Sequence, residues 1–240
     1  MKSKLKKTEV NVPKAVPQAE WHSAHRKFLI KEKEFTRQRD ALAAERRQLP
    51  MEEIEKEYAF QGPEGRRKLA DLFDGKRQLL VYHFMFGPDY DEGCPACSLV
   101  ADNFAGSLVH LAARDTAFAV ISRAPLDKID RFKKRMGWSF PWLSSFDTDF
   151  NYDFHVTLDA KHTEYNYAPV SAQPAGRPQE GEREGLSVFL RDGKRLFHTY
   201  STYQRGIDSL LNTYNFLDLT PLGRQEEDGI MRWVRYHDKY

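Results

Sequence analysis

The sequence predicts an α/β fold with a parallel sheet at its centre and a helical arm at the N-terminus. Two almost wholly apolar runs, residues 78–86 (QLLVYHFMF) and 116–122 (TAFAVIS), have the composition of strands buried on both faces. A segment with helical features follows each run, and alternating strands and helices imply right-handed crossovers and parallel pairing. The 240 residues, 40% of them hydrophobic, suffice for one domain with an extension or for two small domains.

The charge of the chain is nearly balanced overall but is unevenly distributed. Residues 1–50 have a net charge of +7 and residues 51–240 one of −5, so the total is only +2. This total argues against a nucleic-acid-binding protein, which usually has a large positive excess. No apolar run approaches the roughly 20 residues that cross a bilayer, and no apolar signal segment follows the Lys-rich start. We therefore expect a cytoplasmic protein with neither nucleic acid nor a membrane as its partner.

The N-terminal region is predicted to consist of a flexible tail and a helical arm. Residues 1–18 are rich in Lys and include Pro13 and Pro17, which is typical of a flexible basic tail. Residues 19–48 lack Pro and Gly, so we expect one long helix within an arm that extends over 19–50. Apolar residues recur along it at intervals of seven, at Trp21, Phe28, Phe35, Leu42 and Leu49. We expect this narrow stripe to pack against the body of the protein or against a second subunit, as a homodimer.

The body, residues 51–240, begins with short elements around the two buried strands. A short strand, a turn and a single helical turn are predicted before the first of them, at residues 58–61, 62–65 and 69–73. A polar loop and a helix follow it, at residues 87–93 and 94–112. After the second buried strand we expect a helix and then an extended segment, at residues 124–136 and 138–145.

The last part of the body is predicted from its turn residues. Residues 168–185 contain three prolines and three glycines, which predicts a flexible insertion. Two β-rich runs around Asp192–Gly193 predict a hairpin over residues 186–200. A final helix is expected over residues 205–216.

The chain contains only two cysteines, Cys94 and Cys97, three positions apart. A secreted disulfide scaffold would contain more cysteines at wider spacing. Cys94 lies where a loop meets a helix, and free N–H groups with the helix dipole favour thiolate there, at a pKa of roughly 3.5–7.5 in such motifs. Cys97, one helical turn later, can reach the sulfur of Cys94. This spacing predicts a dithiol that exchanges disulfides.

Two other uses of the cysteine pair remain open. A structural zinc site needs four ligands, and the chain has no second pair of cysteines. Five histidines could contribute but have no recognisable metal-ligand spacing from the pair: His83, His110, His155, His162 and His198. We therefore predict no metal and no cofactor, while a non-catalytic or metal-binding module stays as an alternative.

Acidic residues close to the pair are expected to limit its acidity. Asp89, Asp91 and Glu92 lie within five residues before Cys94. Nearby carboxylates disfavour a further negative charge, so we expect the pKa of Cys94 to be only modestly lowered.

Several aromatic residues and a histidine are candidates for a proton relay or a substrate groove. Tyr82 and His83 are neighbours in the first buried strand and therefore point to opposite faces of the sheet. We expect one of them to lie beneath the pair and carry the proton that Cys97 must lose, unless both belong to the core. Trp138 and Trp142 flank Pro141 and are candidates for lining a groove, with a core role as the alternative.

Longer stretches of the sequence resemble a known family. The likeness lies in VYHFMFGPDYDEGCPACS, RMGWSFPWLSS, FNYDF, GLSVFLRDG, FHTYSTYQRG and YNFLDLTPLGR, within residues 20–240. These segments resemble domain-of-unknown-function family 899, which is regarded as a family of dithiol–disulfide oxidoreductases. The order of elements is similar to that of the thioredoxin-like superfamily, in the form shared with peroxiredoxins.

This resemblance implies a three-layer sandwich with a central mixed sheet and helices on both faces. It implies that Cys94 is the nucleophile and that Cys97 resolves the mixed disulfide. The substrate would be a disulfide in a protein or a small molecule, and an unidentified thiol would be the reductant.

The sequence departs from these families at two places. Thioredoxins have a cis-proline just before the strand that faces the cysteines, whereas here Gly185–Leu186 stands there and the nearest proline is Pro178. We therefore place Gly185 in the candidate groove, with the neighbouring insertion as a candidate lid. Peroxiredoxins have the motif Pro-xxx-Thr-xx-Cys, which ends at the reactive cysteine. Here Asp91 occupies the threonine position, and Pro88 lies one residue away from the proline position. Peroxidase activity is therefore the lesser alternative.

Overall fold

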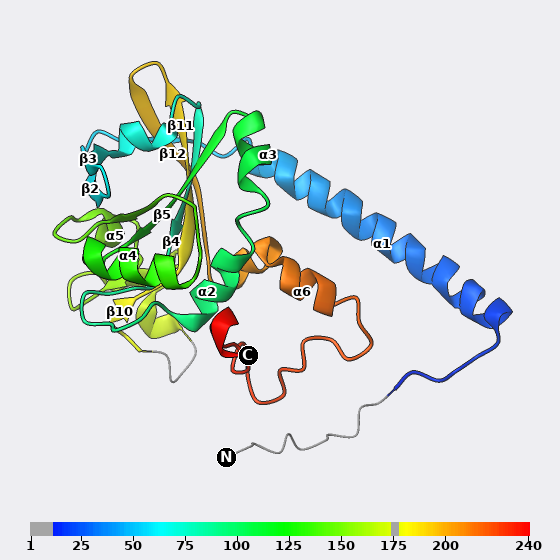
Figure 1. Cartoon of the computed structure of the whole chain (residues 1–240). Coiled ribbons are helices and arrows are strands. Elements are labelled where there is room, and N and C mark those ends of the chain that lie inside the picture. The colour runs from blue at the N-terminus through cyan, green and yellow to red at the C-terminus, as the bar shows by residue number, and fades with distance from the viewer. Residues whose placement is uncertain (1–11, 174–177) are drawn as a thin grey trace, which may run out of the picture.

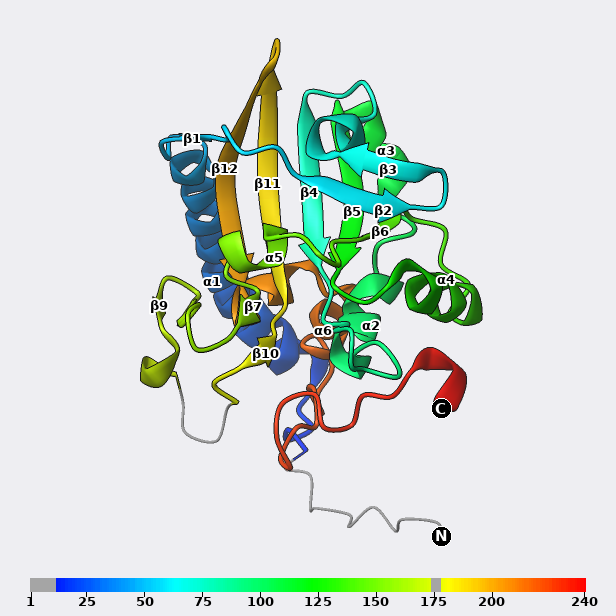
Figure 2. The same ribbon diagram turned by 90° about the vertical axis from the view of Figure 1, so that its left-hand side faces the viewer.

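The computed structural model describes residues 12–173 and 178–240, and its body is built on an eight-stranded mixed sheet (Figure 1). The strand order is β1-β12-β11-β4-β5-β6-β2-β3, which Figure 2 shows face-on. At its centre, β4 (Gln78–His83) runs parallel to β5 (Thr116–Ser122), and β5 runs parallel to β6 (Trp142–Ser144). β4 and β5 lie in the two apolar runs from which a parallel centre is predicted.

An antiparallel hairpin extends the sheet on one side of β4. β11 (Gly185–Asp192) pairs antiparallel with both β4 and β12 (Arg195–Tyr203), as the sequence predicts for residues 186–200. The two-residue β1 (Glu52–Glu53) covers part of the outer edge of β12. In the order β12-β11-β4-β5 only β4 and β5 are parallel, which is the strand arrangement of thioredoxin-like proteins. The predicted fold class is therefore confirmed.

A second hairpin completes the other side of the sheet. β2 (Ala59–Gly62) pairs antiparallel with β3 (Gly65–Lys68) and with β6. The predicted turn over residues 62–65 joins the two strands, and the left-handed φ of +106° at Gly65 favours glycine there. The predicted helical turn is the 3₁₀ helix η1 (Leu69–Phe73).

Helices cover both faces of the sheet, because β4 has no polar face. Tyr82 of β4 belongs to one apolar cluster, against which α2 (Pro95–Asp102), α4 (Leu126–Arg135) and α6 (Asn212–Leu217) pack. Leu79 and Val81 belong to a second cluster with η1 and α5 (Phe150–Asp153). Figure 1 shows α2 and α6 on one side of the sheet and α5 on the other.

Two predicted helices are each divided in the structure. The helix predicted over 94–112 consists of α2, which ends at Asp102, and α3 (Leu108–Ala113), with turns between them. Asn103 and Gly106 lie in that interval, and both residue types are weak helix formers. The helix predicted over 205–216 consists of the 3₁₀ helix η3 (Gln204–Leu210) followed by α6.

The predicted flexible insertion, residues 168–185, contains paired strands on both sides of residues 174–177, which lie outside the described residues. β9 (Ala168–Pro169) pairs with β8 (Glu164–Tyr165), and the 3₁₀ helix η2 (Val170–Ala172) follows it. β10 (Gly181–Glu182) pairs with β7 (Thr157–Leu158). A third apolar cluster anchors this region, with the members Val156, Leu158, Tyr165, Val170 and Tyr203. The Pro and Gly content alone does not reveal these contacts.

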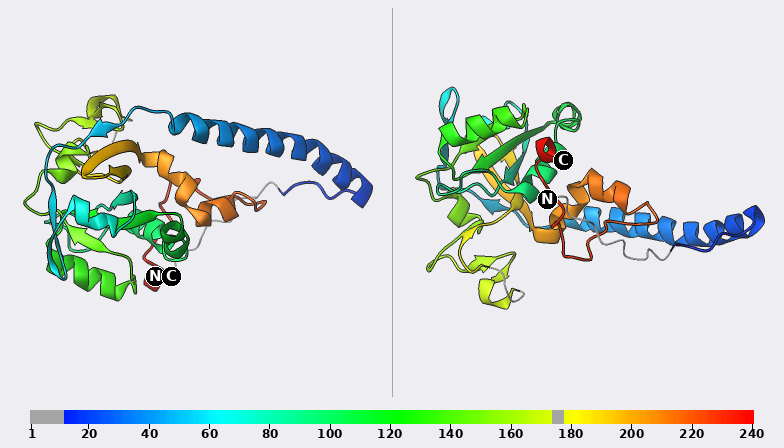
Figure 3. Two further views of the ribbon diagram at one scale, coloured as in Figure 1. Left: turned by 90° about the horizontal axis from the view of Figure 1, so that it is seen from above. Right: turned by 60° about the horizontal axis from the view of Figure 1, so that its bottom comes forward.

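The predicted arm is the helix α1 (Gln18–Arg46), which projects from the body (Figures 1 and 3). It has no buried residue, and Phe35 at the middle of its apolar stripe is 65% exposed. The alternative in which the stripe packs on the body of the same chain is therefore wrong, because the helix leaves the body at its C-terminal end, where Arg46 lies over the ring of Tyr200. Packing against a second subunit stays a prediction. Residues 1–11 of the predicted tail lie outside the described residues.

No helix in the described ranges combines the length and apolar character that a bilayer crossing requires. The remaining short element is the C-terminal 3₁₀ helix η4 (His237–Lys239). Figure 1 shows the C-terminus next to α2, far from β3.

Candidate functional site

The cysteine pair lies at the start of α2, as predicted. Cys94 occupies the N-cap position and Pro95 the first helical position, where a missing N–H costs nothing. The backbone N–H of Cys94 donates to the carbonyl of Met85 at 3.0 Å, which ties the loop to the end of β4. The carbonyl of Cys94 accepts hydrogen bonds from the N–H and the hydroxyl of Ser98, each at 2.9 Å. The first turn of the helix is therefore held rigidly around the pair.

The pKa values of the two thiols are shifted in opposite directions. A hydrogen bond from the Cys97 thiol, assisted by the backbone N–H groups of Cys97 and Ala96, lowers the pKa of Cys94 to about 7 against the opposing effect of burial. Burial, with the neighbouring Cys94 sulfur, raises the pKa of Cys97 well above its usual value. Cys94 is half-buried and Cys97 is buried, and both are free thiols. The outer sulfur is therefore the one that ionises first.

The modest lowering of the Cys94 pKa agrees with the prediction, but the acid responsible is a different one. Glu184, immediately before β11, is the carboxylate that raises the pKa of both cysteines. The prediction names Asp89, Asp91 and Glu92, which are near in sequence only. The fold, by contrast, brings Glu184 to the pair from 87 or more positions along the chain.

Tyr82 is the member of the Tyr82–His83 pair that lies beneath the cysteines. It is fully buried, and its hydroxyl makes no hydrogen bond of standard geometry with the described residues. Burial and the nearby Cys97 sulfur raise the pKa of Tyr82 well above its usual value. Tyr82 in turn lowers the pKa of Cys97. A buried donor aimed at the inner sulfur can therefore stabilise a thiolate there.

His83 points to the opposite face and has the core role that was the alternative for it, so Tyr82 is the candidate that lies beneath the pair. Its ring stacks on Phe150 and Phe154, with centroids 5.5 and 5.9 Å away. Its Nε2 shares a hydrogen bond of 2.8 Å with Ser187 Oγ. Burial lowers the pKa of His83 to about 3, so the ring is neutral in the core at neutral pH.

A small cavity lies beside Cys97. Its volume is about 100 Å³, and most of its lining is apolar. The lining consists of Tyr82, Met85, Ala96, Cys97, Val100, Glu184, Gln204, Ile207, Asp208, Leu211 and Met231. The C-terminal segment closes around the cysteine loop, where the Tyr236 hydroxyl donates to the carbonyl of Gly93 at 2.7 Å.

Of the two tryptophans proposed for a groove, Trp142 belongs to the core, and Trp138 is half-buried and packs against it. Trp142 is 1% exposed, and its Nε1 donates to Ser122 Oγ at 3.0 Å. Trp138 packs against Trp142 with a centroid distance of 5.7 Å, and its Nε1 donates to Asp102 Oδ1 at 2.7 Å. Neither lines the cavity beside Cys97.

Close packing at the end of the sheet requires a glycine at position 185. It pairs with His83 of β4 and Tyr203 of β12, and a Cβ atom there would lie 2.7 Å from the Tyr203 ring. The peptide bonds of the described residues are all trans, so the cis-proline geometry of thioredoxins does not occur among them. The residue that faces the cysteines from this position is Glu184, which the sequence reading missed.

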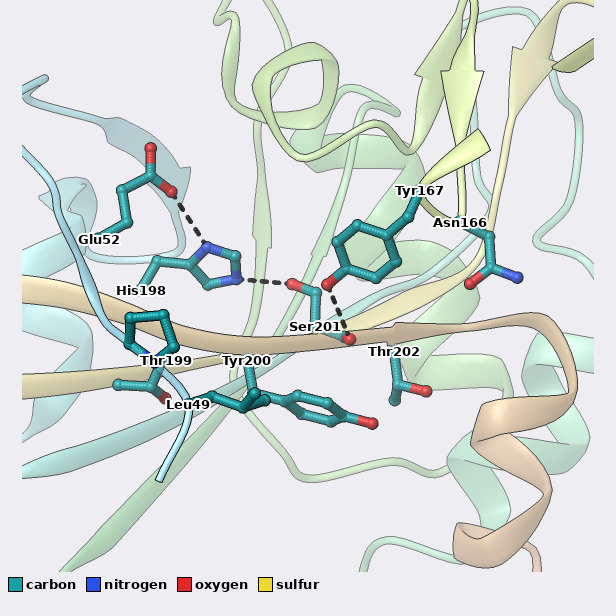
Figure 4. Close-up of a pocket in the computed structure, with 10 residues that line it drawn as sticks. Leu49, Glu52, Asn166, Tyr167, His198, Thr199, Tyr200, Ser201 and Thr202 are labelled. Atoms are coloured by element: carbon teal, nitrogen blue, oxygen red, sulfur yellow. Dashed lines mark hydrogen bonds and ion pairs between the residues drawn. The ribbon is translucent and has the colours of Figure 1, made fainter. Parts of the chain in front are cut away.

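A larger cavity of about 500 Å³ lies elsewhere, along β12 near the end of α1 (Figure 4). There His198 Nδ1 lies 3.4 Å from Glu52 Oε2, and His198 Nε2 shares a hydrogen bond of 2.7 Å with Ser201 Oγ. The chain of hydrogen bonds continues from Ser201 to Ser187 and from Ser187 to His83, with a distance of 2.8 Å in each bond. This polar chain satisfies buried hydroxyls across the three strands β12, β11 and β4 and contains no cysteine. In residues 12–173 and 178–240, no group of three or more His, Cys, Asp or Glu is placed to hold a metal ion.

Among the solved structures similar to this chain are those of several bacterial peroxiredoxins. PrxQ from Xylella fastidiosa is 14% identical, with a TM-score of 0.45 and coverage of 66% of this chain and 88% of that one. Peroxidoxin BcpB from Mycobacterium tuberculosis is 15% identical, with a TM-score of 0.47 and coverage of 69% and 95%. Peroxiredoxin Q from Xanthomonas campestris is 16% identical, with a TM-score of 0.46 and coverage of 66% and 90%.

Sequence comparison identifies the family directly. No curated protein matches the chain. A family model described as "Bacterial protein of unknown function (DUF899)" matches residues 10–240, which include the arm, the cysteine pair and the C-terminal segment. The chain therefore belongs to the DUF899 family of bacterial proteins, as the resemblance of its motifs implies.

Proposed function

We propose that this protein is a thiol–disulfide oxidoreductase in which Cys94 is the nucleophile and Cys97 resolves the mixed disulfide. The observation that carries the proposal is the placement of two free thiols in the first turn of α2, with Cys94 half-buried at the N-cap and Cys97 buried three residues later. With a pKa of about 7, about half of Cys94 is thiolate at neutral pH, and thiolate is the attacking species. Cys97 stays protonated until the first step is complete.

The exchange proceeds in two displacements. The Cys94 thiolate attacks one sulfur of a substrate disulfide, and the other substrate sulfur leaves as a thiolate that takes a proton from solvent. Cys97 then loses its proton and attacks the Cys94 sulfur, which releases the second substrate thiol and leaves a Cys94–Cys97 disulfide. An external thiol restores the reduced pair. The substrate is a disulfide of a protein or a small molecule, in a cytoplasm that keeps thiols reduced.

The experiment uses Ellman's disulfide as the substrate and counts the thiolates released. The wild type should release two per protein molecule and keep no adduct, because Cys97 closes the internal disulfide. Cys97→Ser should release one and retain the adduct on Cys94, as shown by mass spectrometry. Cys94→Ser should react far more slowly, because the remaining thiol is buried and its pKa is raised. Equal rates for Cys94→Ser and wild type would contradict the proposal.

Hydrogen peroxide distinguishes the peroxidase alternative in the same set of variants. The reactive thiolate of the similar peroxiredoxins would have its counterpart in Cys94, but Asp91 stands at the threonine position. We therefore expect Cys97→Ser to form sulfenate on Cys94 no faster than a free thiolate of the same pKa. Rapid peroxide consumption by the wild type would favour the peroxidase instead.

A further inference from the structure

The apolar stripe of α1 stays largely exposed to solvent in the single chain. Its members recur at intervals of seven residues: Trp21, Phe28, Phe35, Leu42 and Leu49. These side chains are 48–65% exposed, although each is large and apolar. A helix in a protein gains most of its stability from the packing of its apolar face, and extended apolar surface of this kind marks interaction sites. A second molecule is therefore needed to cover the stripe.

A second exposed apolar surface lies at the end of α6. We call it the α6 patch, and its members recur at intervals of three residues: Phe216, Leu219 and Leu222. The N–H of Leu219 donates to the carbonyl of Phe216 at 3.1 Å, so these two residues lie one turn apart. The other side of α6 belongs to the core, where Tyr214 is fully buried in the cluster that contains Cys97. The body therefore does not use the α6 patch for its own packing.

The stripe and the α6 patch lie on the same side of the molecule. In Figures 1 and 3, α6 extends along the half of α1 that is nearer to the body. Phe35 and Phe216 are nevertheless 65% and 70% exposed, so the two surfaces do not cover each other within one chain. Most homodimers have a two-fold axis, and such an axis brings the same two surfaces of a second copy to this side.

The positions in the stripe indicate how two arms pair. The stripe is symmetric about Phe35, with two members before it and two after it. An antiparallel pair with its axis at Phe35 brings Phe28 of one copy opposite Leu42 of the other. It likewise brings Trp21 opposite Leu49, near the end of the arm that joins the body. Every member of the stripe then meets an apolar partner.

Charged residues on either side of Phe35 favour the same direction. Glu32 and Arg39 lie three residues before and four residues after Phe35, which places them on its face of the helix. In an antiparallel pair, Glu32 of one copy lies near Arg39 of the other. In a parallel pair each residue lies beside its own equivalent, so like charges meet at both positions. The antiparallel direction is therefore the favourable one.

The antiparallel direction also brings each arm to the α6 patch of the other copy. Trp21 lies opposite the body end of the other arm, and α6 extends along that half of the arm (Figure 3). Residues 1–34 have a net charge of +5, whereas residues 207–230, which contain the α6 patch, have five acids and one arginine, a net charge of −4. Opposite charges on two surfaces favour their association. Charge and apolar character thus favour the same contact.

We propose that the protein forms a two-fold dimer in which the α1 arms pair antiparallel about Phe35 and the Trp21 end of each arm packs on the α6 patch of the other copy. Four aromatic rings in each copy are exposed over about half of their surface or more: Trp21, Phe28, Phe35 and Phe216. Burial of half of the ~150–250 Å² of each ring in both copies removes about 600–1,000 Å² from water. The leucines of both surfaces add to this area, and a stable interface needs ~1,200–2,000 Å².

The test measures the sedimenting mass of variants of the full chain. Phe35→Asp and Leu219→Asp should each halve the mass of the wild-type particle, because each places a charge in an apolar contact. Two matched controls should keep the wild-type mass: Ile30→Asp, on a different face of α1, and Val109→Asp, on α3, both at positions that are 68% exposed. Since Phe35 and Leu219 are 65% and 81% exposed, the fold of the single chain does not depend on them, and circular dichroism checks this.

The direction of the arms is tested with a nitroxide spin label on Ser23→Cys, in a chain whose Cys94 and Cys97 are replaced by serine. Ser23 lies 12 residues before Phe35. The two labels of an antiparallel dimer are therefore separated along the arms by roughly 36 Å, at ~1.5 Å per residue. Electron–electron double resonance should give this distance. A parallel pair, with helix axes ~8–10 Å apart, would give less than about 20 Å.

Each other outcome overturns a stated part of the proposal. A wild type that sediments as a monomer overturns the dimer. Loss of the dimer in Phe35→Asp but not in Leu219→Asp overturns the docking on the α6 patch, and a label distance below about 20 Å overturns the antiparallel direction. A wild-type mass for both Phe35→Asp and Leu219→Asp, or a halved mass for the controls, places the interface elsewhere and overturns the whole assignment.

Discussion

The hydrogen bond from Cys97 is the first cause of the lowered pKa of Cys94, and it can be removed without touching Cys94. Cys97→Ala removes the donor, whereas Cys97→Ser replaces the thiol with a hydroxyl that can still donate. We therefore expect the two variants to differ in the acidity of Cys94 although both lack the resolving sulfur. This comparison isolates the hydrogen bond from the helix N-terminus, which both variants retain.

The magnitude follows from the charge on the acceptor. A hydrogen bond to a charged group contributes about 1.5–3 kcal/mol. At 1.36 kcal/mol per pKa unit, Cys97→Ala should raise the pKa of Cys94 by about 1–2. The thiolate also stabilises the folded state at a pH above the usual thiol pKa, because its folded pKa is the lower one. That contribution, about 2 kcal/mol for a pKa lowered from about 8.5 to about 7, is lost as the pH falls through 7.

The assay is the rate of alkylation of Cys94 by iodoacetamide between pH 5 and pH 10 at constant ionic strength. Wild type should show a midpoint near 7, Cys97→Ser one close to it, and Cys97→Ala one higher by about 1–2. The Cys94→Ser variant measures the background rate of alkylation at Cys97. A wild-type midpoint at or above about 8.5, the value of a free cysteine, would refute the reasoning. Identical midpoints for the Ala and Ser variants would show that the hydrogen bond is not the cause.

Three further predictions concern the scaffold. Gly185→Ala places a methyl group 2.7 Å from the Tyr203 ring, so the free energy of unfolding in urea should fall by about 1–3 kcal/mol; an unchanged value would mean that the ring moves freely. Arg123→Met leaves the buried Glu182 carboxylate without its ion pair, which should cost about 3–5 kcal/mol. Because burial raises the pKa of Glu182, this loss should grow as the pH rises through that pKa, and denaturation that is flat with pH would contradict it. Deleting residues 1–48 should convert a dimer to a monomer in sedimentation, and an unchanged assembly would exclude the arm as the interface.

The sheet could be predicted from sequence where burial leaves a signature along the chain. The runs at 78–86 and 116–122 are apolar because both of their faces are covered, and the hairpin turn at Asp192–Gly193 is a local signal. The short strands β7 to β10 carry no such signature. They are held by side chains such as Tyr165 and Tyr203, whose contact depends on the register of distant strands.

Only those features of the candidate site that depend on residues near one another in the sequence could be predicted. The spacing of Cys94 and Cys97 and their place at a helix N-terminus follow from the sequence. Alternation along β4 puts Tyr82 and His83 on opposite faces but cannot say which face α2 covers. Glu184 lies in a segment rich in Pro and Gly, and only the pairing of Gly185 with His83 reveals its proximity to the cysteines.

The central claim is that Cys94 and Cys97 act as one redox pair, and the most direct test is the product of oxidation by glutathione disulfide. The reduced protein should yield a single internal disulfide between these residues, found by peptide mass mapping. The Cys97→Ser variant should accumulate glutathione on Cys94. Stable glutathione on Cys94 of the wild type, with Cys97 still reduced, would contradict the account.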